Sequence, residues 1–337
     1  MTTKRIFTLC CMLALVNAMV FAKDGAATDM GDSNYKQFNF KKAVLYYKKA
    51  LKRDENNPYL LQKLADSYRL LNDWQAAEPY YARLADMDGT APVNKLYYAE
   101  ALRAAKKYSS ARVYYLKSQA AFPQDSSIRE RIKGMDQMEA LEKDNGLYNI
   151  QNLKNINSEF TEFGVTMHGS DEIYFCSNRK PDAYVRRVDN WTNGTFLELY
   201  AANVKDTGAT AGSVSLLPSD RVNKKFHEAS PCYNEKRNEL YFDRSNYNGT
   251  RSFPSSDKTV KLKIFKVGWL PDAKVWNGEV KEAVPFNNKE YSVSHATLNK
   301  NADTLYFASD MPGGYGRADI YMATRVQIGR ASCRERV

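Results

Sequence analysis

The chain has 337 residues, of which 43% are hydrophobic and 12% aromatic, so it is long enough for more than one folded core. Its formal net charge is +10, but four of these charges lie in two terminal segments described below. The remaining +6 is only mildly basic and gives no argument for nucleic-acid binding. We therefore expect an α + β multidomain protein without a nucleic-acid partner.

Residues 1–22 predict a signal peptide. Lys4 and Arg5 form a short basic start, an apolar run extends to Val20, and Ala22 closes a cleavage site. The segment carries a net charge of +2, and it predicts an exported protein. Within the exported part, Cys176 and Cys232 could form a disulfide or remain two buried thiols, and we favour the unpaired form.

The last ten residues, 328–337, read IGRASCRERV and also carry a net charge of +2. They match one frame of a common sequencing adapter, so we interpret them as an artefact and leave them out of the fold prediction. The natural protein is expected to be longer than this chain.

A 34-residue period organises the segment 23–125. Small residues recur at Ala43, Ala77 and Ala111, and aromatic residues recur at Tyr47, Tyr81 and Tyr115. Four further positions keep the same step: Tyr46, Tyr80 and Tyr114; Phe40, Trp74 and Tyr108; Gly31, Ala65 and Ala99; Pro58 and Pro92. This spacing is typical of tetratricopeptide repeats, in which small residues let paired helices approach closely. We predict about three repeats, a capping helix at 126–145 whose start is capped by the side chain of Ser126 or Ser127, and a linker at 146–160.

The first helix of each pair is expected to line a partner-binding groove. The candidate groove residues are Tyr59, Gln62, Asp66, Arg69, Leu96, Glu100 and Arg103. Arg69 and Arg103 are one period apart, so they would stack on one wall and clamp a peptide carboxylate. Two solvated arginines are an equally good interpretation.

Residues 161–327 show a looser repeat made of short strands. Its central strands are 172–178, 239–245 and 304–310, with Tyr174, Tyr241 and Tyr306 in register. Shorter strands are predicted before them at 163–167, 230–233 and 295–298, and after them at 197–204, 262–267 and 319–323. Three or four strands per unit are typical of propeller blades. Three blades cannot close a ring, so we predict an incomplete β-propeller after a tetratricopeptide α-solenoid.

No catalytic, cofactor-binding or metal-binding constellation is evident in the sequence. His168, His227 and His295 have no neighbours at metal-ligand spacing, and no nucleophile motif is present. We therefore predict that the protein is not an enzyme and needs no cofactor.

The domain order resembles a known family. A tetratricopeptide domain is followed by WD40-like (PD40) blades, the third of which carries Gly313-Gly-Tyr-Gly316 and Asp319-Ile-Tyr321. This order resembles bacterial outer-membrane-associated proteins that end in an OmpA-like peptidoglycan-binding domain, some of which belong to the type IX secretion and gliding machinery. The resemblance covers residues 25–325.

The resemblance implies a periplasmic, outer-membrane-associated scaffold that binds envelope proteins or peptides. It implies peptidoglycan binding only through a C-terminal domain that is missing from this sequence. A soluble periplasmic adaptor or chaperone-like protein is the alternative, and a propeller-gated hydrolase without its catalytic domain is the third hypothesis.

Overall fold

The computed structural model describes residues 25–141, 143, 146, 148–179, 188–204, 214–219, 221–249, 251–276, 279–325 and 331–336. The chain forms two compact units, Met1–Asn149 with Asp189–Gly194, and Ile150–Val188 with Thr195–Val337. The predicted signal peptide lies outside the described residues. Of the suspected adapter segment, residues 331–336 form a strand, and the rest also lies outside. Within the described part, no helix has the length and apolar character of a membrane span.

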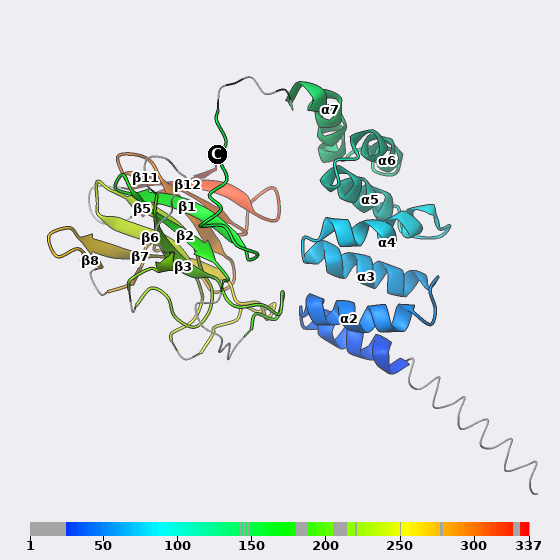
Figure 1. Ribbon diagram of the computed structural model, residues 1–337, viewed down its shortest axis with the longest axis horizontal. Helices are drawn as coiled ribbons and strands as arrows, with labels where there is room; N and C mark the ends of the chain where they lie inside the picture. Colours follow the sequence, from blue (N-terminus) through cyan, green and yellow to red (C-terminus); the bar gives the residue numbers. More distant parts are fainter. Residues whose placement is uncertain are drawn as a thin grey trace, which may run out of the picture. The chain divides into compact units, whose positions relative to one another are not determined.

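The helical unit is a stack of antiparallel helices that follow one another in chain order (Figure 1). A first helix covers residues 25–36. It is followed by α2 (Phe40–Leu51), α3 (Pro58–Leu70), α4 (Trp74–Asp86), α5 (Val93–Ala104), α6 (Tyr108–Ala121) and α7 (Ser126–Leu141). The starts of α2, α4 and α6 are evenly spaced by the 34-residue step, so the sequence period is the period of the helix pairs. The unit therefore has the tetratricopeptide fold predicted from the sequence, with α7 after the third pair.

The starts of α3, α4 and α7 are capped by side chains that accept hydrogen bonds from free backbone N–H groups. Asn57 caps α3 by accepting from Leu60 N at 3.2 Å, and Asp73 caps α4 by accepting from Ala76 N at 3.0 Å. For α7, the expectation of a serine cap was wrong. Asp125 accepts from Ser127 N at 2.9 Å, because a carboxylate just before the helix reaches the free N–H groups of its first turn.

The small and aromatic positions of the 34-residue period meet in the core of the helical unit. Ala43, Ala77, Ala111, Tyr47, Tyr81 and Tyr115 are all fully buried. The second tyrosine set, Tyr46, Tyr80 and Tyr114, is only partly buried. Close packing is tightest at Gly31, where an added Cβ would lie 2.5 Å from Cε1 of the Tyr47 ring. Because that ring has no room to move, glycine is the residue that fits this position.

We predict that Gly31→Ala destabilises the helical unit. Overpacking of a buried site costs about 1–3 kcal/mol, which exceeds the roughly 0.5–1 kcal/mol that alanine gains over glycine in a helix. Gly134 in α7 is the matched control, because an added Cβ there meets nothing within 4 Å. Thermal unfolding should show a lower midpoint for Gly31→Ala and an equal or higher midpoint for Gly134→Ala. Equal midpoints for both variants would contradict this packing argument.

The second unit consists of three antiparallel sheets. The first contains β1 (Glu162–His168), β2 (Glu172–Ser177), β3 (Glu198–Asn203) and β4 (Ser215–Leu216). The second contains β5 (Glu228–Asn234), β6 (Glu239–Ser245), β7 (Leu262–Leu270) and β8 (Val275–Trp276), with β9 (Lys281–Glu282) also paired to β7. The third contains β10 (Val293–Leu298), β11 (Thr304–Ser309), β12 (Asp319–Arg325) and β13 (Ala331–Arg336). The three strands predicted for each repeat are all present.

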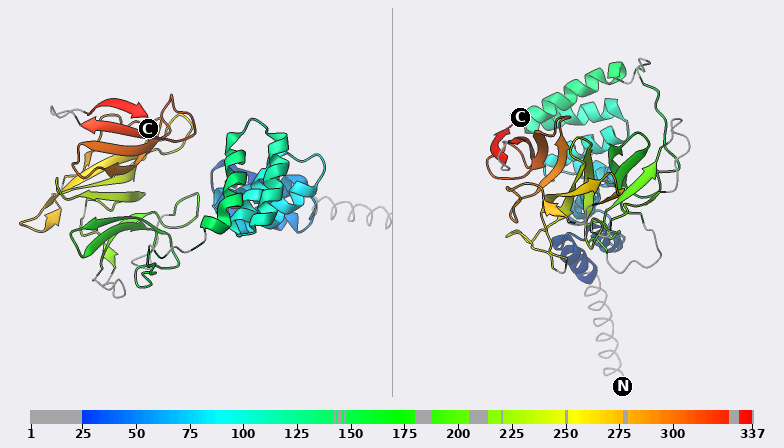
Figure 2. Two further views of the ribbon diagram at one scale, coloured as in Figure 1. Left: turned by 90° about the horizontal axis from the view of Figure 1, so that it is seen from above. Right: turned by 90° about the vertical axis from the view of Figure 1, so that its left-hand side faces the viewer.

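Consecutive sheets pack face to face in chain order (Figure 2). Their first strands share an irregularity, a bulge whose central residue has positive φ: Gly164, Ser230 and His295. At the second junction the His295 backbone N–H donates one hydrogen bond that is shared by the two carboxyl oxygens of buried Asp243, at 2.9 and 3.0 Å. Cys176 occupies the register position of Asp243 in the first sheet. Cys176 and Cys232 are both free thiols.

Asp243 makes the stability of the sheet unit depend on pH. Burial raises the pKa of Asp243 from 3.8 to about 7, so the folded protein favours the protonated form. The stability that this group contributes is present in full below pH 3.8 and is lost as pH rises toward 7. We predict that Asp243→Asn stabilises the protein relative to wild type on the order of 1–3 kcal/mol at pH 8, and by less at pH 4.

Urea unfolding followed by tryptophan fluorescence at both pH values measures this difference. Asp272→Asn serves as a control, since Asp272 is exposed in the turn after β7. A stability difference between wild type and Asp243→Asn that does not change with pH would contradict the raised pKa of Asp243.

Candidate functional site

The predicted partner-binding residues lie on the first helices of the pairs, and we call the face formed by helix 25–36, α3, α5 and α7 the A-helix surface. Each repeat places a carboxylate on this surface beside the buried tyrosine of the next helix. The Tyr47 hydroxyl donates to Asp32 Oδ1 at 2.7 Å, and the Tyr81 hydroxyl donates to Asp66 Oδ1 at 2.7 Å. Asp32, Asp66 and Glu100 keep the 34-residue step, so the pair is part of the repeat.

The third repeat keeps this pair as Glu100 and Tyr115. Burial, followed by the charge of Glu100, raises the pKa of Tyr115 to about 12. Burial also raises the pKa of Tyr47 and Tyr81. The three phenols therefore stay protonated. Tyr47 and Tyr81 donate to their carboxylates, whereas the buried Tyr115 hydroxyl has no hydrogen-bond partner among the described residues. The carboxylates of Asp32 and Asp66 on the A-helix surface are thus hydrogen-bonded to tyrosines of the core.

Arg69 is already engaged within the fold. Its NH2 group lies 3.2 Å from Asp66 Oδ1, and its Nε donates to the Tyr81 hydroxyl at 3.0 Å. The guanidinium also stacks over the Tyr97 ring, 4.4 Å from the centroid. Gln62 completes the network by donating to Asp66 Oδ2 at 3.0 Å. The structure therefore brings Gln62, Asp66 and Arg69 together as one neutralised cluster, in which the Arg69 side chain is only 22% exposed.

At the third repeat, the carboxylate of Glu100 contacts two arginines. Arg103 NH2 contacts Glu100 Oε2 at 2.9 Å, and Arg131 of α7 contacts the other oxygen of the same carboxylate. The two arginine side chains are 47% and 40% exposed, whereas the Glu100 side chain is only 10% exposed. Two accessible guanidinium groups thus share one largely buried carboxylate.

Arg131 was missed by the sequence prediction, although the period contains a signal for it. Lys63, Tyr97 and Arg131 occupy the same position of successive repeats, and each faces the preceding repeat. Lys63 lies over the Tyr35 ring at 4.3 Å, just as Arg69 lies over Tyr97. The first two interfaces between repeats each pair a cation with an aromatic ring. At the third interface both of these positions are arginines, Arg103 and Arg131.

The remaining predicted residues have different surroundings. Tyr59 is 46% exposed, and its hydroxyl donates to Asp32 Oδ1 at 2.8 Å. Leu96 packs against the second core cluster of the helical unit, which contains Ala99 and Tyr115. Leu96 is therefore largely a packing residue, because its helix turns that side toward α6 and α7.

The sequence also did not predict a pocket on the second helices of the pairs, between α2 and α4. It has a volume of about 360 Å³ and is lined by Lys48, Leu51, Lys52, Glu55, Tyr80 and Arg83. Arg83 donates to Asn56 Oδ1 at 2.8 Å and to the backbone of Glu55, so it holds the turn before α3.

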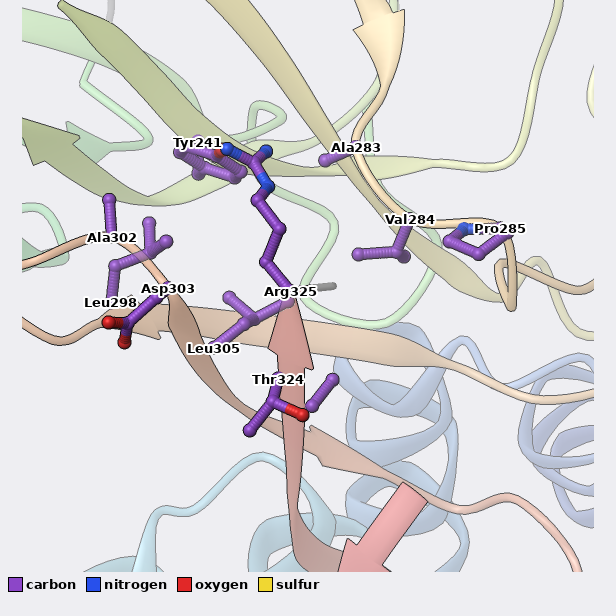
Figure 3. A pocket seen from close by; sticks show the side chains of 11 residues that line it. Tyr241, Ala283, Val284, Pro285, Leu298, Ala302, Asp303, Leu305, Thr324 and Arg325 are labelled. Atoms are coloured by element: carbon purple, nitrogen blue, oxygen red, sulfur yellow. The ribbon is translucent and has the colours of Figure 1, made fainter. Parts of the chain in front are cut away.

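Hollows are also found among the described residues of the sheet unit. One, of about 690 Å³, lies where β1, β5 and β10 end, and its lining includes Met167, Asn234 and Asn299. The other, of about 100 Å³, lies between the second and third sheets, and Figure 3 shows the Arg325 side chain reaching across it to Tyr241. Arg325 occupies the register position of Trp269, which fills the first junction together with Trp276 and His168.

Within the described residues, no group of three or more His, Cys, Asp or Glu side chains is arranged to hold a metal ion. His168 contacts Glu172 at 2.7 Å and the Tyr174 hydroxyl at 2.8 Å, inside the aromatic packing of the first junction. His295 lies beside Asp243 at the second junction. The His168 ring is thus packed between sheets, whereas the His295 side chain is 62% exposed and only its backbone N–H is held by Asp243.

Comparison with known proteins gives matches only among solved structures. No family model and no curated protein matches the chain. The first tetratricopeptide domain of Spaghetti (RPAP3), bound to the HSP90 peptide SRMEEVD, is 20% identical, with a TM-score of 0.31, covering 35% of this chain and 94% of that one. The Arabidopsis OM64 tetratricopeptide domain is 20% identical, with a TM-score of 0.30 and coverages of 34% and 95%. The Sgt2 domain from Aspergillus fumigatus is 14% identical, with a TM-score of 0.30 and coverages of 39% and 87%.

Proposed function

We propose that this protein is a non-enzymatic scaffold whose A-helix surface binds the carboxylate end or an acidic segment of a partner protein. One observation carries the proposal: Arg103 and Arg131 share a single carboxylate, Glu100, and both are accessible. The excess positive charge at this point attracts an anionic group, and guanidinium groups suit the planar geometry of a carboxylate.

The surroundings of Arg69 argue against a clamp made by Arg69 and Arg103, the pair that the sequence suggested. Arg69 has its charge balanced by Asp66 and its face covered by Tyr97. A ligand carboxylate would have to displace these contacts, whereas at Arg103 and Arg131 it completes an unbalanced cluster. We therefore place the anion-binding end of the surface at the third repeat, with exposed Tyr59 toward the other end.

For the second unit, we propose that the three sheets are blades of a β-propeller. This is supported by the shared bulge in their first strands and by the packing of β5 against both β1 and β10. The hollow of about 690 Å³ at the ends of these strands is the corresponding candidate for a second partner-binding surface.

We further propose that the protein works in the periplasm, associated with the outer membrane, and holds envelope proteins there. The basic and apolar pattern of residues 1–22 and the order of the two repeat domains support this. Attachment to peptidoglycan would belong to an OmpA-like domain outside this sequence. Fractionation of cells that carry the natural gene tests the location, and recovery of the protein only from the cytoplasm would contradict it.

Substitution of Arg131 by Ala should weaken carboxylate binding about tenfold or more, because a charge-assisted hydrogen bond contributes about 1.5–3 kcal/mol. The probe is the labelled peptide SRMEEVD, compared with its C-terminal amide, in a fluorescence anisotropy titration of the chain. We expect the wild type to prefer the free acid, and both Arg131→Ala and Arg103→Ala to reduce this preference.

Arg112→Ala is the matched control for this titration. Arg112 is 44% exposed and has its own single carboxylate partner, Asp136, so its removal should leave the affinity unchanged. Equal binding of acid and amide by the wild type, or an equal loss with Arg112→Ala, would overturn the proposed site.

A further inference from the structure

The pocket between α2 and α4 carries an excess of positive charge. Its lining holds three cations, Lys48, Lys52 and Arg83, against the single carboxylate of Glu55. In the part of the chain that the structure describes, no carboxylate forms an ion pair with any of the three cations, and Asp73 acts on Lys48 only through its more distant charge. The volume of about 360 Å³ is near the lower end of the roughly 300–1,000 Å³ of ligand pockets, so a ligand of the size of one residue fits.

Packing holds two of these cations in place. Lys48 Nζ lies over the Tyr68 ring, 5.4 Å from its centroid, and the Tyr68 ring stacks on the Tyr80 ring with the centroids 6.0 Å apart. Arg83 is fixed by its hydrogen bonds to the turn before α3. An anion that enters the pocket therefore meets cations that are already positioned, so its binding orders fewer flexible side chains.

The next interface between second helices shows what the pocket lacks. Tyr80 and Tyr114 are one period apart, and so are Lys52 and Asp86. In the later repeat the Tyr114 hydroxyl donates to Asp86 Oδ1 at 3.3 Å. In the earlier repeat the position of this acceptor is taken by the cation Lys52, at the side of a hollow. An internal carboxylate is thus replaced by an arrangement that can accept an anion from outside.

Tyr80 adds a neutral donor and an apolar surface to the pocket. Burial raises the pKa of Tyr80, although the charges of Lys48 and Arg83 act in the opposite direction. The hydroxyl therefore stays protonated and is a hydrogen-bond donor beside the cations. The Tyr80 ring and the buried Leu51 side chain give the same pocket a wall that suits a flat apolar group.

We infer that this pocket is a second binding site of the helical unit, for a phosphate monoester carried on a small ring. A phosphate monoester has a charge of about −1.5 to −2 at pH 7 and three acceptor oxygens, which suits three cations that face one carboxylate. A carboxylate brings only one charge. The site uses residues of α2 and α4, so it is separate from the proposed peptide site at Arg103 and Arg131.

Isothermal titration calorimetry of the chain with three probes tests the ligand class. Phenyl phosphate should bind about tenfold more tightly than inorganic phosphate, because its ring covers Tyr80 and Leu51. It should also bind more tightly than benzoate, which has the same ring but a single charge. Equal affinity for phenyl phosphate and either of the other two probes would overturn the inferred ligand class.

The residues of the site are tested by reversing one charge. Lys52→Asp should weaken the binding of phenyl phosphate about tenfold or more, because a cation that contacts the phosphate becomes an anion. Lys49→Asp is the matched control. Lys49 is an exposed lysine of the same helix that does not line the pocket, and at physiological salt its charge is largely screened. Both variants should keep the circular dichroism spectrum and the melting of the wild type, since both side chains are exposed.

Arg131→Ala separates this site from the peptide site. It should leave the affinity for phenyl phosphate unchanged, whereas it weakens the binding of the peptide carboxylate. Weaker binding of phenyl phosphate by Arg131→Ala, with no loss in Lys52→Asp, would place the phosphate on the A-helix surface and overturn the inference. An equal loss in Lys52→Asp and Lys49→Asp would also overturn it, because the attraction would then come from the general charge of α2.

Discussion

The hydrogen bond between a buried tyrosine and a carboxylate, made by Tyr47 to Asp32 and by Tyr81 to Asp66, is the interaction on which the first two helix pairs depend. The tyrosine ring fills the space between helix pairs, and its hydroxyl would be a costly unpaired group there without an acceptor. Asp66 provides that acceptor for Tyr81 and at the same time faces the A-helix surface. Packing in the core and charge on the binding face are therefore set by the same residues.

This coupling explains why the three repeats differ in what they can bind. In the second repeat, Asp66 is balanced by Arg69, which is itself held between Tyr81 and Tyr97. In the third repeat, the carboxylate meets two arginines, and the second comes from the helix that ends the stack. An accessible positive charge thus arises where the repeat pattern ends, since α7 has no further repeat to neutralise it.

Much of the fold could be predicted from the sequence, because its determinants recur at fixed spacing. The small residues and tyrosines of the helix pairs and the Tyr174, Tyr241 and Tyr306 register of the sheets are visible without knowing any contact. The site was less predictable. The role of Arg69 depends on a tyrosine from the next repeat, and Leu96 is partly buried against the core around Tyr115. The helix cap at Asp125 and the positive-φ bulges depend on local backbone geometry that the strand pattern does not reveal.

The most direct test of this account is a double-mutant cycle on Asp66 and Tyr81, measured as the free energy of unfolding of the chain. Asp66→Asn and Tyr81→Phe each remove part of the shared hydrogen bond and leave the shape of the side chain nearly unchanged. If the pair couples the core to the A-helix surface, the two effects will be non-additive by about 1 kcal/mol or more. Effects that add to within about 0.3–0.5 kcal/mol would contradict the central claim.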